Sequence, residues 1–438
     1  MSGPLLLTKL AHASLRISGS AGSIVTDPWF TGRVFADSWA HSELPHSSAV
    51  DALVECAYIW VSHGHPDHFS PPTLLSVPEE RRSRITALIL ETRPNQELIG
   101  WFRRNGFSVQ LLKHHRRLEL QPGLFVESGE VHFGDSWLWL SIDGWSILNV
   151  NDCVLGNSEL RYLRRRFKDV DVLAIQYGVA NWTGNPEDEV RRATAARSVL
   201  DRVERVVGKI CPKFVLPFAS EFRFCHEENA YLNSSQNAVE DVEQLMAHRK
   251  QKCLVLENGD SVDRDGLITR NREVAQLETG THQSVGHVQL GDLQRLYRNR
   301  LRETGEYHGR FRMFVYRKLI GCFPFGKIVV DVSDLGQRLT ISSSRLVNSL
   351  PHEATEIRMS SEMLAEVVAK PYGLDNLFIG GRFRRSDDSA LLKLGLIFGP
   401  DRLRSMGLHM GPSLFLRPRL LSALFGRLVS GRWSSRSR

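Results

Sequence analysis

The stretch of sequence that decides the fold is Val61-Ser62-His63-Gly64-His65-Pro66-Asp67-His68-Phe69, which follows an apolar run from Ala57. Such a run before a turn is typical of a buried strand. Three imidazoles and a carboxylate then lie within six residues on the loop that leaves the strand. A turn lets alternate residues point the same way, so these four side chains can converge on metal. So many ligands so close together predict two metal ions side by side, and the alternative is a solvated polar loop.

Around this loop, from Leu5 to about Asp260, short apolar strands alternate with amphipathic helices, which predicts an α/β fold. The expected strands are 23–26, 57–61, 85–89, 118–126, 137–142, 146–150, 170–175 and 214–217, and the expected helices are 96–104, 158–167, 186–207 and 238–248. Before Asp152 the strands follow one another with few helices. That mixture favours an α/β sandwich of two mixed sheets over a doubly wound parallel sheet.

A turn-rich, charged stretch from Asp260 to about Gly280 predicts the boundary of this domain. We expect a catalytic domain over residues 1–265, a smaller α+β domain over residues 281–415 and a tail over residues 416–438. The smaller domain is predicted to contain strands at 328–332, 337–341 and 376–379 and a serine-capped helix at 360–370.

The composition is that of a globular protein, with 438 residues, 42% hydrophobic and 24% charged residues. The six cysteines form no C-x-x-C pair, and no apolar stretch is long enough to span a membrane, so we expect a cytoplasmic protein with reduced thiols. The sequence has no Gly-rich phosphate loop, zinc finger or aromatic-basic strand pattern, and therefore no specific nucleic-acid signal.

The net charge of +7 is concentrated in the tail. Residues 417–438 contain no Asp, Glu or Lys, and their arginines account for six of the seven charges: Arg417, Arg419, Arg427, Arg432, Arg436 and Arg438. Apolar residues recur there at helical spacing, which predicts a short basic amphipathic helix. Contact with an anionic membrane surface or a partner, and packing on the second domain, are both open interpretations of the tail.

The motif His63-x-His65-x-Asp67-His68 after a strand, with Thr26-Asp27-Pro28-Trp29 upstream, resembles the metallo-β-lactamase fold superfamily. The resemblance implies an αββα sandwich whose metals are completed by a further histidine, a bridging aspartate and a last histidine. It assigns these roles to His132, Asp152 and His226. His114 and His115 are rivals of His132 for the third ligand.

Several blocks more specifically resemble the CMP-N-acetylneuraminate (sialic acid) hydroxylases. They are 129–132, 147–153, 217–222 with His226 a few residues on, 331–334 and 377–383. Those hydroxylases begin with a Rieske domain, whose iron–sulfur cluster needs Cys-x-His and Cys-x-x-His pairs. This sequence has neither pair, so oxygen chemistry would require electrons from a separate Rieske- or ferredoxin-type protein.

The ligand set leads to a hydrolase as the first hypothesis. Two divalent ions, zinc or alternatively iron, would be held by His63, His65 and His132 on one side and by Asp67, His68 and His226 on the other. With Asp152 between them, a metal-bound hydroxide could attack an anionic ester, lactone or phosphodiester, and Asp67 could accept a proton. A di-iron oxygenase is the alternative, and a binding protein that keeps the fold without activity is a third possibility.

Residues around the motif could complete the site. Arg223 is a candidate clamp for an anionic small-molecule substrate, because a guanidinium pairs bidentately with phosphate or carboxylate. Asn149, Asn151 and Cys153 flank Asp152 and could orient it. Tyr177, Trp182 and Glu221 could line a substrate pocket, although aromatic residues are more often part of a core.

Overall fold

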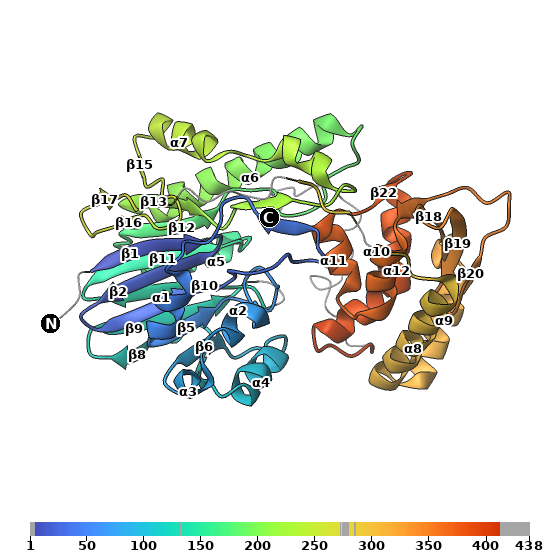
Figure 1. Cartoon of the computed structure of the whole chain (residues 1–438), viewed down its shortest axis with the longest axis horizontal. Coiled ribbons are helices and arrows are strands. Elements are labelled where there is room, and N and C mark those ends of the chain that lie inside the picture. The colour runs from blue at the N-terminus through green and yellow to red at the C-terminus, as the bar shows by residue number, and fades with distance from the viewer. Residues whose placement is uncertain (1–4, 132–133, 272, 274–279, 284–285, 412–438) are drawn as a thin grey trace.

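The computed structural model describes residues 5–131, 134–271, 273, 280–283 and 286–411. Two mixed β-sheets stack face to face in its N-terminal part (Figure 1). The first sheet has the order β17-β16-β1-β2-β3-β5-β6-β7, with β1 (Leu6–Ala11), β2 (Ser14–Gly19), β3 (Gly22–Thr26), β5 (Tyr58–Val61), β6 (Thr86–Leu90), β7 (Ser108–Leu112), β16 (Ser261–Val262) and β17 (Ile268–Thr269). The second has the order β15-β13-β12-β11-β10-β9-β8, with β8 (Leu118–Gln121), β9 (Leu124–Glu130), β10 (Ser136–Ile142), β11 (Trp145–Asn151), β12 (Val172–Gln176), β13 (Phe214–Phe218) and β15 (Lys252–Cys253).

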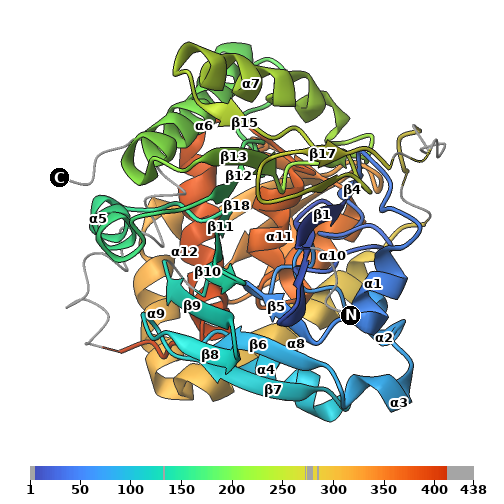
Figure 2. The same cartoon turned by 90° about the vertical axis from the view of Figure 1, so that its left-hand side faces the viewer.

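Apolar side chains on both faces of the strands decide this stacking. Ile24 and Trp60 from the first sheet meet Leu140 and Val172 from the second in the core between the sheets. The outer face of the first sheet packs on α1 (Ala49–Glu55), α2 (Pro71–Leu75) and α4 (Gln96–Arg104), with α3 (Glu79–Arg82) beside them. The outer face of the second sheet packs on α5 (Asn157–Arg166), α6 (Glu189–Ile210) and α7 (Val239–His248). The predicted αββα sandwich is confirmed, and Figure 2 shows it from the side, with α6 and α7 at one end and α3 and α4 at the other.

The C-terminal elements form the predicted α+β unit at the other end of the molecule (Figure 1). Its sheet has the order β20-β19-β18-β21-β22, with β18 (Lys327–Val332), β19 (Gln337–Ser342), β20 (Leu346–Asn348), β21 (Ile357–Met359) and β22 (Arg384–Arg385). Its helices are α8 (Leu290–His308), α9 (Arg310–Gly321), α10 (Ser361–Ala369), α11 (Gly373–Gly380) and α12 (Asp388–Ser405), with the 3₁₀ turn η2 (Pro324–Gly326). In the N-terminal part, β4 (Trp39–His41) pairs with β14 (Phe222–Phe224), and η1 (Ala230–Ser235) follows.

Two predicted elements differ from the structure. The strand expected over 118–126 is a hairpin of β8 and β9, because Gly123 adopts a φ of 84° at the turn that joins them. The strand expected over 376–379 is part of helix α11, which ends at Gly381 in the left-handed conformation. A short apolar run has no periodicity that separates a buried strand from a buried helix, and tertiary packing decided between them.

The segment from Leu377 to Phe383 joins the C-terminal unit to the sandwich. A Cβ atom on Gly380 would lie 2.4 Å from Ser38 Oγ, so the glycine packs against the Ser38 side chain more closely than a larger residue could. The Gly380 carbonyl accepts a hydrogen bond of 2.6 Å from Asn229 Nδ2. The apolar core is continuous across this junction, because Trp39 and Phe222 belong to the same cluster as the C-terminal helices.

Arg382 is fully buried at the same junction. Its guanidinium lies 2.8 Å from the carboxylates of both Glu228 and Glu362 and donates to the Ala36 carbonyl at 2.7 Å. Glu228 and Ala36 belong to the sandwich, and Glu362 begins α10 of the C-terminal unit. One buried cation therefore bonds to both units.

No helix in the described ranges is long and apolar enough to cross a membrane. The predicted amphipathic tail, residues 416–438, lies outside these ranges. The first sheet continues past residue 265, because β17 pairs with β16 at its edge.

We predict that Arg382→Ala lowers the free energy of unfolding by about 3 kcal/mol, because it leaves two partly buried carboxylates without their shared cation. Urea unfolding followed by tryptophan fluorescence measures the change. Arg384→Ala removes an exposed arginine two residues away and should change the free energy by less than about 0.5 kcal/mol. An equal loss in both variants would contradict the assigned role of Arg382.

Candidate metal centre

The histidines and aspartates of the centre lie at one edge of the sandwich, each next to the end of a strand. His12 directly follows β1, Asp27 follows β3, and the stretch from His63 to His68 follows β5. Asp152 follows β11 of the second sheet. Because both sheets end at this edge, side chains that are far apart in the sequence meet there.

Backbone strain occurs at two of these strand ends. Asp27 has a φ of 38° and Asn151 has a φ of 43°. Asp and Asn tolerate the left-handed region better than other non-glycine residues, but the conformation still has an energetic cost. Strain of this kind clusters at functional sites, and here it turns both residues toward the same edge.

The side chains form three overlapping groups, in each of which the possible ligand atoms lie within 4.8 Å of one another. The groups are His12, Asp67 and His68; His63, His68 and Asp152; and His63, His65 and Asp135. The Nε2 atom of His68 is 3.3 Å from Asp67 Oδ2 and 3.8 Å from Asp152 Oδ2. Since His63 and His68 are each shared by two groups, the cluster is continuous and large enough for more than one cation.

The polar atoms at the centre of the cluster fit a cation. Within the described ranges, His12 Nε2, His68 Nε2, Asp67 Oδ1 and Asp152 Oδ1 are buried and have no hydrogen-bond partner. Buried polar atoms are nearly always paired, so several unpaired ones at one point require an explanation. A divalent ion supplies it, because imidazole nitrogen and carboxylate oxygen are both zinc and iron ligands.

Asp27 holds the imidazole of His68 from behind. Its carboxylate is fully buried and accepts hydrogen bonds from Ser62 N at 2.8 Å and from Asn151 Nδ2 at 3.1 Å. It also lies 3.0 Å from Nδ1 of His68. A carboxylate accepts from Nδ1–H, which fixes the tautomer of the ring and aims Nε2 at Asp67 and Asp152.

The charges in the cluster balance one another in the metal-free protein. Burial by itself would raise the pKa of Asp67, but the His68 and His12 imidazoles hold that pKa well below its usual range. Burial would likewise lower the pKa of His68, but Asp67, Asp27 and Asp152 raise it well above 6.5. The pKa of His65 is lowered by burial and by His63. The surrounding carboxylates therefore favour the protonated form of His68 in the metal-free protein.

The structure brings together five of the predicted metal residues, namely His63, His65, Asp67, His68 and Asp152. His132 lies outside the described residues, but Asp135, three residues further on, reaches the group of His63 and His65. Asn151 was predicted to orient Asp152. Its Oδ1 accepts a hydrogen bond of 2.6 Å from the backbone N–H of Asp152.

His226 lies elsewhere, in none of the three groups formed by the described residues. Its Nδ1 is 3.4 Å from Glu228 Oε2, and its ring lies edge-on to His282 at 5.7 Å. Burial and the charge of Arg382 lower the pKa of His226 to about 4, so its imidazole is neutral. Between Phe218 and His226 the chain passes through β14, which carries it away from the strand edge.

The rival histidines His114 and His115 are also outside the groups. His115 stacks on Tyr162 at 3.7 Å and lies 3.0 Å from Glu159, and His114 Nδ1 accepts from the Glu130 backbone. Both pack against α5 and β9 on the outer face of the second sheet.

The residues expected to line a pocket have structural roles in the described molecule. Tyr177 belongs to the core beneath α6, and Trp182 to the core of the C-terminal unit. Glu221 pairs with the buried Lys9 at 3.0 Å.

Arg223 lies in a hollow of its own. It lines a volume of about 390 Å³ together with Arg33, Cys225, Gly280, Thr281 and His282. On β14 its neighbours Phe222 and Phe224 are buried, and the Phe222 ring approaches His12 at 5.8 Å. Because successive side chains of a strand point to opposite faces, Arg223 faces away from His12.

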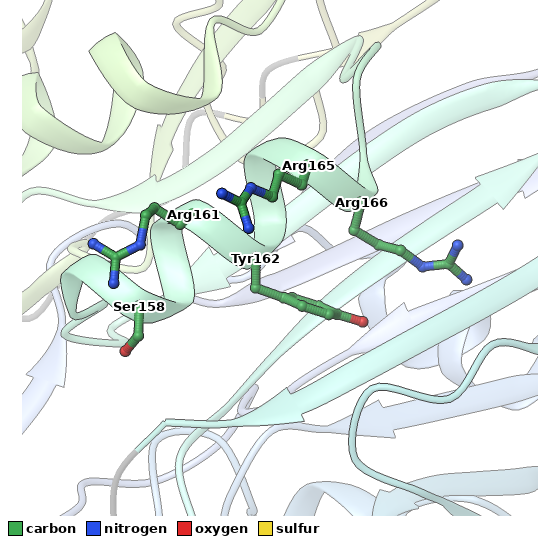
Figure 3. Close-up of a pocket in the computed structure, with 5 residues that line it drawn as sticks. All are labelled: Ser158, Arg161, Tyr162, Arg165 and Arg166. Carbon is green, nitrogen blue, oxygen red and sulfur yellow. The ribbon is translucent and has the colours of Figure 1, made fainter.

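A second hollow, of about 380 Å³, lies along α5 on the outer surface of the sandwich (Figure 3). Ser158, Arg161, Tyr162, Arg165 and Arg166 line it. Tyr162 and Arg166 both bond to the buried Glu127, so two of the five lining residues hold the helix on the sheet.

His12 and Asp135 were missed by sequence reasoning. A histidine at the end of an apolar strand, in Leu10-Ala11-His12-Ala13, was the available signal, and it places His12 in the same kind of position as His63. Asp135 had no signal of its own, because single carboxylates in loops are common.

No family model matches this chain. It is 26% identical over 426 residues to the cytidine monophosphate-N-acetylneuraminic acid hydroxylase of Cricetulus griseus, which covers 88% of this chain and 73% of that protein. It is 27% identical over 286 residues to a protein of Mycobacterium tuberculosis named for a Rieske 2Fe-2S iron–sulfur centre, and this match covers 59% of the chain. The chain spans about half the length of that relative, 54%.

Solved structures match the sandwich part. An isothiocyanate hydrolase from Delia radicum gut bacteria superposes with a TM-score of 0.41 and 14% identity, over 59% of this chain and 98% of that one. The metallo-β-lactamase fold protein YhfI of Bacillus subtilis has a TM-score of 0.38 and 10% identity, over 59% and 99%.

The architecture agrees with the αββα sandwich that the resemblance to the metallo-β-lactamase fold superfamily implied. The two stacked sheets, the outer helices and the His-x-His-x-Asp-His loop at the strand edge are the features that the sequence resemblance implied. The resemblance to the sialic acid hydroxylase covers 88% of the chain and so extends into the C-terminal unit.

We predict that Zn²⁺ binding releases about one proton at pH 7, because a ligand must take the place of the proton on His68. Calorimetry in buffers of different ionisation enthalpy measures the released proton. Since the pKa of metal-free His68 is raised, affinity should increase with pH, by up to about tenfold per unit while His68 is protonated. His46→Gln, which alters a buried histidine outside the three groups, should keep this slope. An affinity that does not vary with pH would contradict the assignment.

Asp27→Asn should weaken Zn²⁺ binding about 10- to 100-fold, because an amide cannot replace the carboxylate that fixes the His68 ring. Competition with a chelating dye measures the affinity, and thermal unfolding checks that the variant is folded. Asp51→Asn, at an exposed site on α1, is the matched control and should bind Zn²⁺ like the unaltered protein. Equal affinity in the two folded variants would show that Asp27 does not position the ligand.

Proposed function

We propose that the protein is a hydrolase that depends on two divalent metal ions bound at the edge of the sandwich. The observation that carries the proposal is the set of buried nitrogen and oxygen atoms on His12, His68, Asp67 and Asp152 that make no hydrogen bond. A protein that kept only the fold would gain stability by replacing these groups with apolar ones, since unpaired buried polar atoms are costly. Their retention supports a bound cation and chemistry at this point.

The proposal divides the ligands between two positions. His63 and His65, with Asp135 and the undescribed His132 as further candidates, would hold one ion, and Asp67, His68 and His12 would hold the other. Asp152 lies 3.7 Å from His63 Nε2 and 3.8 Å from His68 Nε2, so its carboxylate can reach both. We take His12, rather than His226, as the last imidazole. Zinc is our first choice of metal and iron the alternative.

The bound ions would supply a low-pKa water and polarise the bond to be cleaved. The protein residues hold and shape this site. Asp27 fixes the His68 ring, and Asp67 stays ionised because His68 and His12 lower its pKa. A carboxylate with so low a pKa is a better metal ligand than proton acceptor. The rings of Trp29 and Phe222 flank His12 and exclude water from that side.

The substrate we propose is a small anionic ester, lactone or phosphodiester. Arg33 and Arg223 line the same hollow on the ribbon of β4 and β14, and guanidinium groups pair with phosphate or carboxylate. Because Arg223 faces away from His12, we assign it to a part of the substrate remote from the reacting bond. The six cysteines all lie in the described part and are unpaired, which supports a cytoplasmic location.

A di-iron oxygenase remains the second candidate. The 26% identity to the hydroxylase of Cricetulus griseus extends over 88% of this chain, including the C-terminal unit. Imidazole and carboxylate ligands also suit iron that reacts with oxygen. This candidate requires electrons from a separate Rieske- or ferredoxin-type protein.

Metal analysis and an activity screen test the proposal. The purified protein should contain about two zinc ions per chain and hydrolyse at least one of a phosphodiester, a lactone and a carboxylic ester. Asp152→Ala should lower kcat/KM at least about a hundredfold, because one carboxylate serves both ions. Glu119→Ala, at an exposed position on β8, is the matched control and should leave kcat/KM unchanged.

Removal of the metal distinguishes the two candidates. A chelator should abolish hydrolysis and added Zn²⁺ should restore it. Hydrolysis that persists in the chelated protein would contradict the proposal. A protein that contains iron, and whose reduced form changes its visible absorption when oxygen is added, would favour the oxygenase.

A further inference from the structure

Helix α9 and the turn directly after it display a stripe of large apolar side chains at the surface of the C-terminal unit. Phe311 is 77% exposed, Phe314 57%, Leu319 57% and Phe323 59%. Val315 lies between them and is also exposed. A monomeric protein rarely leaves so many large apolar side chains together in water, so the stripe marks an interaction surface.

The spacing places these residues on one side of the helix. Positions 311, 314, 315, 318 and 319 lie three or four residues apart, so their side chains lie above one another on one face. The opposite side holds the helix on the unit, where Met313 is buried and the Tyr316 hydroxyl bonds to the Leu396 carbonyl at 2.5 Å. The helix is therefore fixed in a position that presents its apolar face outward.

Within residues 309–327 the charge has one sign, and Lys327 at the end of this segment pairs with Glu353 at 2.7 Å. Residues 309–327 contain no Asp or Glu, and their cationic residues are Arg310, Arg312, Arg317, Lys318 and Lys327. Lys318 lies within the apolar stripe, with its Nζ 5.8 Å from the centre of the Phe314 ring. The carboxylate of Glu306 on α8 pairs with Arg310 at 3.5 Å. A partner that fits this face should have an anionic outer layer and an apolar layer under that outer layer.

We propose that the α9 face, defined as Phe311, Phe314, Val315, Lys318, Leu319 and Phe323, docks on the surface of an anionic lipid bilayer. Aromatic and aliphatic side chains enter the boundary between headgroups and acyl chains, and nearby cations bind the anionic headgroups. A lysine inside an apolar stripe suits this boundary, because its stem packs in the apolar layer while its charge reaches the headgroups.

The described chain ends beside this helix. Arg312 donates to the Met410 carbonyl at 3.2 Å, and the His409 ring stacks on Tyr307 at 4.3 Å. The sequence after Gly411 therefore starts next to α9, and it contributes only arginines as charged residues from position 417 onward. A second basic segment would repel the α9 cations, whereas anionic lipid attracts both. Docking through α9 also leaves the metal centre accessible, because α9 lies at the opposite end of the molecule from the two stacked sheets (Figure 1).

Sedimentation with lipid vesicles tests the docking of the full-length protein. It should bind vesicles of phosphatidylcholine that contain roughly 30–40% of the anionic lipid phosphatidylserine. It should bind vesicles of pure phosphatidylcholine at least about fivefold more weakly. The double variant Phe314→Ser, Leu319→Ser should bind the anionic vesicles at least about tenfold more weakly. Lys318→Ser should lose about fivefold.

The matched control is Val190→Ser, Leu267→Ser, which removes two exposed apolar residues from the sandwich, and it should bind like the unaltered protein. Thermal unfolding of each variant checks the fold. Absence of binding by the unaltered protein would overturn the proposal. The proposal would also be overturned if a variant with the tail arginines replaced by serine no longer bound the vesicles while the Phe314→Ser, Leu319→Ser variant still did. Sedimentation velocity measures the oligomeric state and so tests the remaining alternative. A dimer that is absent in the Phe314→Ser, Leu319→Ser variant would show that a second copy of the chain, and not lipid, occupies the face.

Discussion

The buried carboxylate of Asp27 is the constraint on which the centre depends. It is fully enclosed, and an ionised carboxylate in such a place is stable only with several charge-assisted hydrogen bonds. Its three partners come from Ser62 and His68 after β5 and from Asn151 at the end of β11. Satisfying one carboxylate therefore joins the two sheets at their edge and fixes the imidazole between Asp67 and Asp152.

The C-terminal unit completes this edge of the sandwich instead of standing apart from it. Trp39 stacks on Phe222 at 3.7 Å in the ribbon of β4 and β14, and Phe222 lies against His12. The same ribbon packs into the core that contains β18, α10 and α12. A change in the C-terminal unit can thus reach the cluster through two aromatic rings. This continuity agrees with the resemblance to the hydroxylase, which extends over both units.

The same donor set supports two kinds of chemistry, and the protein residues near it do not separate them. Imidazole and carboxylate suit zinc as a Lewis acid and iron as an oxygen-binding centre. The two reactions differ in their need for electrons: oxygenation requires an electron donor, and hydrolysis does not. The basic pI also has a local origin, since the tail carries six of the seven net positive charges, while the rest of the chain taken together is nearly neutral.

The sequence by itself determined the alternation of strands and helices, the sandwich and the loop from His63 to His68, because these depend on local periodicity and close spacing. Helix α4 was predicted with its observed bounds, and the resemblance to the metallo-β-lactamase fold superfamily assigned Asp152 to the cluster in which it lies. Only the tertiary structure decided that 376–379 is helical, that His12 joins the cluster and that His226 and Arg223 turn away from it. Those outcomes depend on contacts between residues far apart in the chain, and no local pattern records which distant strand ends meet.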